Sequence, residues 1–361
     1  MALDIKIKKH LPAFDLDIEF TAGAEAIGFL GASGCGKSLT LRCIAGVETP
    51  DEGHIIVNGK TFFDSDKKIN LTPQQRKTAL LFQNYQLFPN LTVAQNVAAG
   101  MPKGLPKEEV ARRVKHYLGM FDLDGFQSRY PLRLSGGQQQ LVALARMLAA
   151  EPDVLMLDEP FSALDAHLTA GLEQNMLDVF DRYEGTILYV SHDIDEAFRL
   201  CDRIAVVSGG HIEEMGTARD IVMNPTTLAG LKLSGCKNIS RAHWDHNHTI
   251  EALDWGISLK VGPDVEIPED LAYIGARAKF IRLADPGETG HNLYEMRVHR
   301  VVENRFDALI TLEPPAGAGA ADKTLIYWRV DKLPLDESQI PRPGDVVPLH
   351  FDARHLYLAT R

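Results

Sequence analysis

The first two thirds of the chain alternate short, fully apolar runs with segments in which apolar residues recur every three or four positions. An uninterrupted apolar run is typical of a strand covered on both faces, whereas the longer spacing indicates an amphipathic helix. We expect one helix after Ser38 and another over about residues 137–150. Strands that alternate with helices predict an α/β layer structure with a largely parallel sheet. The expected strands are Ala26–Leu30, Ile55–Val57, Leu80–Phe82, Val154–Leu157, Ile187–Val190 and Ile204–Val207.

Near residue 235 this pattern gives way to short β-type segments separated by turn-forming residues, without a long amphipathic helix. Many short strands with frequent turns predict an all-β domain of the barrel or OB-like type. We therefore expect an α/β domain over residues 1–235 and a β domain over residues 236–361. The expected strands of the second domain are His248–Leu253, Ile257–Val261, Ala276–Ile281, Leu293–Val302, Ala308–Leu312, Thr324–Val330 and Val346–Phe351.

Composition narrows the class of protein. The 361 residues include 38 Lys and Arg against 49 Asp and Glu, a formal net charge of −11. Such an acidic chain is a poor candidate for non-specific nucleic-acid binding, which depends on basic side chains that neutralise phosphates. The four cysteines have no CxxC spacing, and no run of 18 apolar residues occurs. These features predict reduced thiols, no transmembrane helix and a soluble intracellular protein with no nucleic-acid partner.

A glycine-rich segment after the first expected strand points to phosphate binding. Residues 31–38 read GASGCGKS and fit the pattern G-x-x-x-x-G-K-[ST] between a strand and a helix. Glycines let the backbone N–H groups wrap around phosphates, and the helix N-terminus favours the anion. Lys37 is expected to reach the β- and γ-phosphates, and Ser38 to ligate Mg²⁺. The nucleotide-binding candidates are Gly31, Ala32, Ser33, Gly34, Cys35, Gly36, Lys37, Ser38 and Leu39.

Two adjacent carboxylates, Asp158 and Glu159, follow the apolar run VLML. Carboxylates at the end of a buried strand are costly unless something cationic or polar meets them. Downstream of a phosphate-binding loop, Asp158 is expected to hold the Mg²⁺ shell. Glu159 points to the other side of the strand, where it could polarise a water for attack on the γ-phosphate.

The segment LSGGQ at residues 134–138 resembles the signature motif of ATP-binding cassette (ABC) ATPases. Gln83 resembles that family's Q-loop glutamine, Asp165 its D-loop aspartate and His192 its switch histidine. The resemblance covers about residues 1–235 and implies a P-loop ABC cassette that uses ATP and Mg²⁺, with Gln83 and His192 joining Glu159 in catalysis and Gln83 also a metal ligand. The signature residues implied to contact nucleotide are Ser135, Gly136, Gly137 and Gln138, together with Asp165.

The same resemblance implies a head-to-tail dimer of two copies. Each ATP would lie between the P-loop of one copy and the signature motif of the other, so binding would close the dimer and hydrolysis would release it. With one P-loop and one signature motif, the chain requires a second copy of itself. His192 would contact the γ-phosphate and the attacking water.

One departure concerns adenine. Family members usually carry a Tyr or Trp before the P-loop that stacks on the base, but no Tyr or Trp precedes residue 31 here. His10 or Phe14 could take this place, and Phe14 could equally be a core residue. Weak contacts with the base predict weak discrimination between ATP and GTP.

The segment Gln83–Val93 resembles the form found in importers, where it receives a coupling helix of the membrane subunit. A separate β domain after the cassette is likewise a feature of importers. The resemblance therefore implies a cytoplasmic subunit held at the inner face of the membrane by permease subunits, with a substrate-binding protein as an indirect partner.

The substrate is implied only by finer likeness. Residues 58–65 and 69–76 resemble the molybdate importers, with sulfate importers nearby, and residues 292–330 with 345–358 resemble their TOBE module. The residues at Thr289–Asn292 depart from that module's oxyanion-binding start, which favours a packing or dimer-contact role. Sugar, polyamine and iron importers stay open as alternatives. A non-transport ABC ATPase acting on DNA or ribosomes, and a P-loop kinase, are disfavoured.

Overall fold

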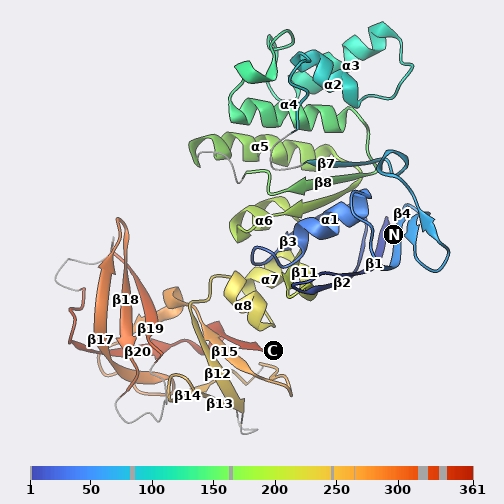
Figure 1. Ribbon diagram of the computed structural model, residues 1–361. Coiled ribbons are helices and arrows are strands. Elements are labelled where there is room, and N and C mark those ends of the chain that lie inside the picture. The colour runs from blue at the N-terminus through green and yellow to red at the C-terminus, as the bar shows by residue number, and fades with distance from the viewer. Residues whose placement is uncertain are drawn as a thin grey trace. The chain divides into compact units, whose positions relative to one another are not determined.

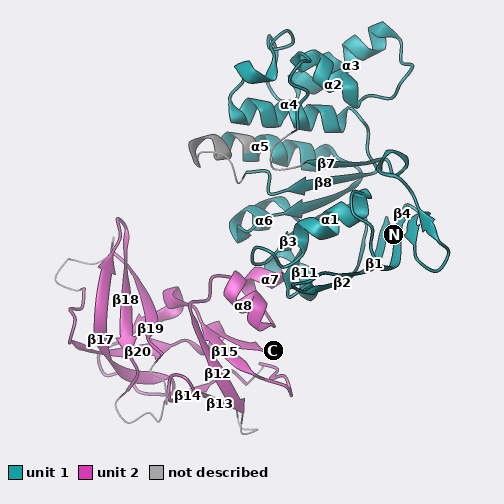
Figure 2. Cartoon of the chain, in the orientation of Figure 1, with its two compact units in different colours: residues 1–219 teal, residues 220–361 magenta. Residues whose placement is uncertain are grey.

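The computed structural model describes residues 2–81, 86–161, 166–244, 248–263, 265–315, 324–332 and 340–360, and only the backbone of 166–170 and 172. The chain forms two compact units, residues 1–219 and 220–361 (Figure 2). The short helix α8 (Leu228–Leu233) packs against strand β21 (Leu356–Ala359) and so belongs to the second unit. The division by contacts thus lies upstream of residue 235, where the change in sequence pattern places the domain boundary.

A six-stranded sheet forms the centre of the first unit, in the order β11-β10-β3-β9-β8-β7. Its strands run parallel except β11, which pairs antiparallel with β10 at the edge. Every residue of β3, β8 and β9 is buried, as the continuous apolar runs predict. The strands are β3 (Ala26–Leu30), β7 (Thr78–Leu81), β8 (Val154–Asp158), β9 (Thr186–Val190), β10 (Arg203–Ser208) and β11 (His211–Thr217).

A second sheet, entirely antiparallel, has the order β2-β1-β4-β5-β6. The prediction of a strand at Ile55–Val57 is confirmed, but this strand lies in the antiparallel sheet and not among the parallel strands. In β1 and β2 of this sheet, buried residues recur at every second position over most of the strand, the pattern of a sheet with one face in the core. The strands are β1 (Leu3–His10), β2 (Asp15–Ala22), β4 (Glu52–Val57), β5 (Lys60–Asp64) and β6 (Ile69–Asn70).

Helix α1 (Lys37–Ala45) lies between these two sheets (Figure 1). One hydrophobic core joins residues of both sheets with Leu41, Cys43 and Ile44 of this helix. The helix therefore has its apolar side chains fixed on two faces, while its N-terminal end projects from the carboxyl edge of β3. This arrangement holds the glycine-rich loop in a rigid setting.

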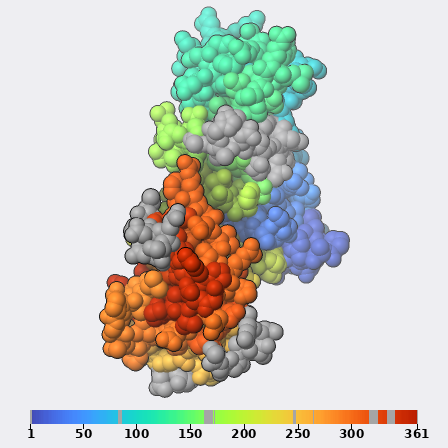
Figure 3. Space-filling model, turned by 90° about the vertical axis from the view of Figure 1, so that its left-hand side faces the viewer, coloured from blue at the N-terminus to red at the C-terminus, as the bar shows by residue number. Residues whose placement is uncertain are grey.

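The remaining helices of the first unit include a helical lobe formed by α2, α3 and α4, which gathers at one end of the unit (Figures 1 and 3). Helix α4 confirms the helix expected over residues 137–150. Among the described residues, no helix is long and apolar enough to cross a membrane. The helices are α2 (Val93–Gly100), α3 (Lys107–Gly119), α4 (Gly136–Leu148), α5 (Ala166–Arg182) and α6 (Ile194–Leu200), with the 3₁₀ turns η1 (Pro73–Gln75) and η2 (Pro131–Arg133).

The second unit begins near α7 (Ala218–Met223) and builds two five-stranded sheets, β14-β13-β12-β15-β21 and β16-β20-β17-β18-β19. Side chains from both sheets form one core around the fully buried Trp255. The predicted all-β, barrel-like domain is confirmed. Its other strands are β12 (Asn238–Trp244), β13 (Thr249–Ala252), β14 (Ile257–Lys260), β15 (Tyr273–Ala276), β16 (Ile281–Leu283), β17 (Leu293–Glu303), β18 (Asp307–Glu313), β19 (Ile326–Asp331) and β20 (Val346–Phe351).

The strand predicted at Ala276–Ile281 is wrong. The chain leaves β15 at Ala276, makes the 3₁₀ turn η3 (Ala278–Phe280) and enters β16 at Ile281. Since β15 and β16 belong to different sheets, a corner is needed here. Stacking of Phe280 on His355, which belongs to the turn η5 (Ala353–His355), fixes the corner with ring centroids 3.9 Å apart.

Candidate functional site

The glycine-rich loop leaves the carboxyl end of β3 and enters α1. Two of its glycines have no room for a side chain. A Cβ on Gly31 would collide with the carbonyl oxygen of Val207, and one on Gly36 would lie 2.5 Å from Cδ1 of Leu16. Gly36 also has φ 112°, in the left-handed region that favours glycine. The close approach of the loop to the sheet thus explains why these residue types stand here.

Lys37 folds back over the loop. Its ammonium donates to the carbonyl oxygens of Gly31 at 2.7 Å and Ala32 at 2.9 Å, and lies 3.7 Å from Sγ of Cys35. Only 5% of Lys37 is exposed. The positive charge of Lys37 therefore lies inside the turn of the loop, where it can form a charge-assisted hydrogen bond with a bound phosphate.

Ser38 and Asp158 come together although 120 positions separate them. The Ser38 hydroxyl donates to Oδ1 of Asp158 at 2.7 Å. Burial raises the pKa of the Asp158 carboxyl, and the hydrogen bond from Ser38 and the nearby charge of Arg42 oppose this rise. The predicted pair of magnesium ligands thus brings a hydroxyl and a carboxylate together where the loop enters α1, beside the end of β8.

Glu159 lies beyond the end of β8 with φ 47°, a strained conformation for a residue other than glycine. Its backbone N–H donates to the carbonyl oxygen of Val190 at 2.9 Å, which holds it beside the end of β9. Nδ1 of His192 lies 3.8 Å from Oε2 of Glu159. The two side chains predicted to handle the attacking water are therefore neighbours.

Glu196 braces the loop that carries His192, and the sequence analysis missed it. Its Oε2 accepts hydrogen bonds from the hydroxyls of Ser191 at 2.7 Å and Tyr189 at 2.9 Å. The Ser191 hydroxyl in turn accepts from the backbone N–H of Asp193 at 2.9 Å. A carboxylate in the first turn of α6 is the one signal in the sequence that could have indicated this role.

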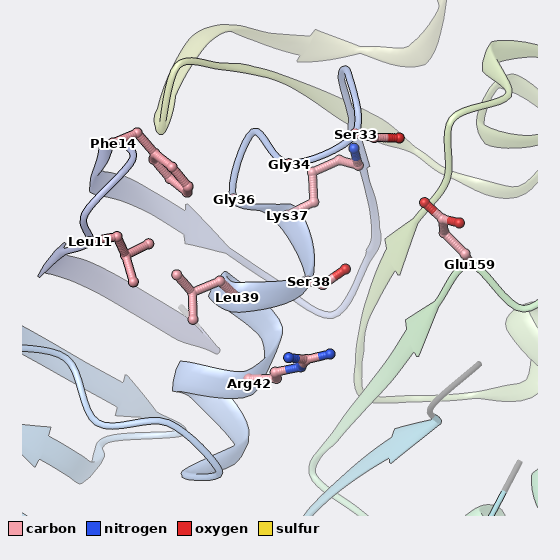
Figure 4. Close-up of a pocket in the computed structure, with 10 residues that line it drawn as sticks. All are labelled: Leu11, Phe14, Ser33, Gly34, Gly36, Lys37, Ser38, Leu39, Arg42 and Glu159. Carbon is pink, nitrogen blue, oxygen red and sulfur yellow. The ribbon is translucent and has the colours of Figure 1, made fainter. Parts of the chain in front are cut away.

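A cavity of about 420 Å³ opens at the loop. Leu11, Phe14 and Leu39 lie on one side of Lys37 and Ser38, and Glu159 lies on the other (Figure 4). Phe14 also packs against the core, as one of its two predicted roles requires, and its contact with adenine stays a prediction. Arg42, which the sequence analysis also missed, lines the cavity one turn after Ser38 on the same helix face. The lining residues are Leu11, Phe14, Ser33, Gly34, Gly36, Lys37, Ser38, Leu39, Arg42 and Glu159.

The signature segment lies at the start of α4. Ser135 is the N-cap residue, and its hydroxyl accepts from the backbone N–H of Gln138 at 3.3 Å while the Gln138 side chain accepts from Ser135 N–H at 3.1 Å. Gly136 is exposed and Gly137 buried. Of the described residues that line the cavity, none belongs to this segment. Gln83 and Asp165 lie outside the described residues.

Comparison with known proteins identifies the family. Residues 15–162 match the family model described as ABC transporter. The sulfate/thiosulfate import ATP-binding protein of Nocardia farcinica is 35% identical over 324 residues, 89% of this chain and 93% of that protein. The spermidine/putrescine import ATP-binding protein of Rubrobacter xylanophilus is 34% identical over 94% of this chain and 88% of its own. The Fe(3+) ions import ATP-binding protein of Escherichia coli is 36% identical over 73% of each chain.

Solved structures agree with this assignment. A dimeric ATP-binding cassette bound to ADP and Pi after hydrolysis is 27% identical, with a TM-score of 0.51 over 61% of this chain and 99% of its own. The cbiO1 protein of Clostridium perfringens, part of the ABC transporter complex cbiONQ, is 26% identical, with a TM-score of 0.52 over 61% of this chain and 90% of its own. The predicted cassette fold is confirmed. The chain therefore belongs to the ATP-binding subunits of ABC importers, which hydrolyse ATP to drive transport.

Proposed function

We propose that ATP is hydrolysed at the cavity beside Lys37, with Glu159 as the general base. The hydrogen bond between Ser38 and Asp158 at the mouth of the loop is the observation that carries this proposal. Lys37 and the backbone N–H groups of the loop hold the phosphates. A carboxylate of Glu159 takes the proton of the attacking water, and His192 beside it orients that water.

Ser38 and Asp158 also fit a magnesium ion. Mg²⁺ prefers oxygen ligands, keeps several waters and is bound by one or two protein groups together with substrate phosphates. A hydroxyl and a carboxylate side by side meet this need, and the described residues hold no cluster of three or more His, Cys, Asp or Glu that would suit a metal bound by protein alone. When bound, Mg²⁺ would neutralise charge on the β- and γ-phosphates.

A second copy of the chain completes the site in this proposal. Ser135 caps α4, and Gly136 and Gly137 begin its first turn, where backbone N–H groups have no partner within the helix. None of the three residues lines the cavity of its own chain. A helix N-terminus of this kind attracts a phosphate. In a head-to-tail dimer it faces the ATP held by the partner's loop, as the likeness to a dimeric cassette supports.

Phe14 is proposed to contact the base. It lines the cavity together with the aliphatic Leu11 and Leu39, and stacking on an aromatic side chain contributes about 1–3 kcal/mol per base. Phe14→Ala is therefore expected to raise the KM for ATP about tenfold in steady-state phosphate-release assays. Since apolar contacts do not read the edge of a base, kcat/KM for ATP and GTP should differ by less than about tenfold.

His10→Ala is the matched control for Phe14→Ala. His10 is the last residue of β1, just before the turn that carries Phe14, but its ring is hydrogen-bonded to Asp15 at 2.9 Å and does not line the cavity. His10→Ala should leave the KM for ATP and the KM for GTP unchanged. A hundredfold preference of the wild type for ATP would contradict the proposed mode of base binding, and an unchanged KM in Phe14→Ala would restrict Phe14 to the core.

We further propose that the permease docks near Phe88. This side chain is 49% exposed in the segment that the sequence likens to the importer form. The fully buried Asn96 holds the segment in place, because it accepts from Phe88 N–H at 2.8 Å and donates to the carbonyl oxygens of Phe88, Leu91 and Thr92 at 3.1 Å each. An exposed aromatic ring on a fixed backbone suits a protein interface.

Phe88→Ala tests the docking surface. We expect it to keep the basal ATPase rate within about twofold and to lower the rate in the assembled transporter by about tenfold, since buried aromatic anchors dominate such interfaces. Phe306→Ala removes an equally exposed ring, 58% exposed, from the β17–β18 turn and serves as the control. Equal loss in both variants, or none in Phe88→Ala, would argue against docking at Phe88.

Molybdate or a related oxyanion is the substrate that we propose. The support is the likeness of residues 58–65 and 69–76 to molybdate importers and a relative that imports sulfate and thiosulfate. Relatives that import spermidine and putrescine or Fe(3+) keep polyamine and iron import as the alternatives. The test is stimulation of the assembled transporter's ATPase by binding proteins loaded with each candidate. Stimulation by a polyamine- or iron-loaded protein alone would reject the oxyanion. In this proposal the subunit sits at the cytoplasmic face of the membrane, held there by the permease.

The second unit is proposed to act in packing or dimer contacts. In the stretch Thr289–Asn292, the side chain of Asn292 is hydrogen-bonded to the backbone of Lys260. Its Oδ1 accepts from Lys260 N–H at 2.7 Å and its Nδ2 donates to the Lys260 carbonyl oxygen at 2.9 Å. Only 6% of Asn292 is exposed. This use of the amide supports a structural role for the stretch over oxyanion binding.

A further inference from the structure

Arg76 is a fully buried cation in the first unit, with 0% of its surface exposed. Its Nη1 donates to the carbonyl oxygens of Cys43 at 2.7 Å and Ile44 at 2.9 Å. Its Nε donates to the Leu71 carbonyl, and its Nη2 to Oδ1 of Asn70, both at 2.9 Å. All four acceptors are neutral oxygens. A buried charge is costly without partners, so this one is retained for what it holds together.

The carbonyl groups of Cys43 and Ile44 belong to the last turn of α1. The last four carbonyl groups of a helix lack partners within it and carry the negative end of its dipole. Arg76 supplies both N–H donors and positive charge at that end. The opposite end of the same helix begins with Lys37 and Ser38, about 10 Å away at ~1.5 Å per residue. One short helix thus has the phosphate site at one end and Arg76 at the other.

Gly46, which follows the helix, shows how closely Arg76 approaches. It has φ 79° and caps the helix, and a Cβ there would lie 2.6 Å from Nε of Arg76. The ring of Phe62 lies on another side, 5.9 Å from the guanidinium carbon. The guanidinium is thus enclosed by the end of α1, strand β5 and the chain that follows β6. Strand β7 begins two residues after Arg76.

We propose that Arg76 is a positioning residue for the phosphate site, which fixes the far end of α1 and thereby the placement of Lys37 and Ser38. The proposal rests on the phosphate site proposed above. Two hydrogen bonds from Arg76 hold the C-terminal end of the helix, and its other two hold Asn70 of β6 and the adjacent Leu71, so the side chain links α1 to the edge of the antiparallel sheet. Loosening that end lets the helix tilt or shift along its axis, which moves the loop at its other end away from the geometry that the phosphates need.

Arg76→Lys is the variant that tests this. Lysine keeps the positive charge, but its single ammonium lacks the planar fork that bridges acceptors on two elements. We expect the KM for MgATP to rise about tenfold, a change of about 1.4 kcal/mol, while kcat changes by less than threefold. The assay measures phosphate release at a temperature at which circular dichroism shows the variant fully folded.

Two controls separate positioning from plain loss of stability. Lys60→Met removes a cation that lies 5.7 Å from the same Phe62 ring and donates to Gln75 O at 2.9 Å, without a described bond to α1. Val114→Ala shortens a buried side chain of α3 and is expected to lower the melting temperature. Both are expected to keep the wild-type KM.

Two outcomes would overturn the inference about Arg76, and a third would reject the phosphate site on which it rests. A lower melting temperature of Arg76→Lys with a wild-type KM would overturn the inference, because it would place Arg76 with Val114 as a residue of the core. A raised KM in Val114→Ala would overturn it too, since KM would then follow stability alone. Unchanged ATP affinity in Lys37→Ala would reject the phosphate site itself, whatever Arg76 does.

Discussion

Replacing Glu159 by glutamine is expected to lower kcat for ATP hydrolysis by about 10²–10⁴-fold, the usual contribution of a positioned general base. Glutamine is nearly isosteric with glutamate but accepts no proton at neutral pH. The affinity for ATP should stay within about threefold, because the loop and Lys37 hold the phosphates. The measurement is phosphate release at saturating ATP, beside equilibrium binding of a fluorescent ATP analogue.

The same variant should accumulate a dimer. With binding intact and hydrolysis blocked, ATP stays between the two copies, so light scattering after gel filtration should show twice the monomer mass in ATP and the monomer mass in ADP. Such a dimer would also support the proposed head-to-tail arrangement.

Glu151→Gln is the control for Glu159→Gln. Glu151 is likewise a glutamate with φ 47°, but it precedes β8 at the opposite edge of the sheet and pairs with Arg113. It should keep the wild-type kcat and form no ATP-dependent trapped dimer. Wild-type turnover in Glu159→Gln would assign the base to another residue, with His192 the next to test.

The glycine-rich loop and the Asp158–Glu159 pair could be predicted because the residues that give each its chemistry are consecutive in the sequence. Residues 31–38 lead from the end of a strand through a turn into a helix within eight positions. The run VLML followed by two carboxylates predicts a buried strand with the carboxylates at its end. Local pattern and local structure agree here, so the prediction needs no knowledge of distant contacts.

The parts that escaped prediction depend on residues far apart in the chain. The guanidinium of Arg76, for example, is bound to the carbonyl group of Cys43, 33 positions earlier in the chain. An arginine two residues before a strand ordinarily indicates a solvated loop, and only the folded sheet shows that it is buried. The antiparallel strands β1 and β2 were missed for a related reason, since alternating patterns such as LDIKIKKH are short and half polar.

Loss of Lys37 is expected to weaken MgATP binding by about 10- to 150-fold. A hydrogen bond to a charged group contributes about 1.5–3 kcal/mol, and Lys37 is the one cation that the described part of the chain places inside the loop. In the structure this ammonium is bound to the Gly31 and Ala32 carbonyl oxygens, so phosphate binding means that it exchanges neutral acceptors for anionic ones. That exchange is favourable because the ammonium then meets an opposite charge in a buried setting, where the Coulomb attraction is stronger than in water.

The measurement for Lys37→Ala is the dissociation constant of a fluorescent ATP analogue, with Lys9→Ala as the control. The Lys9 ammonium also donates to a backbone carbonyl, that of Thr49 at 2.8 Å, but it lies outside the cavity lining. Wild-type affinity in both variants would reject this loop as the phosphate site. Because alanine is a better helix former than lysine and the position begins α1, the variant should also keep its fold. A loss of affinity with an unchanged melting temperature would therefore assign the effect to the missing ammonium.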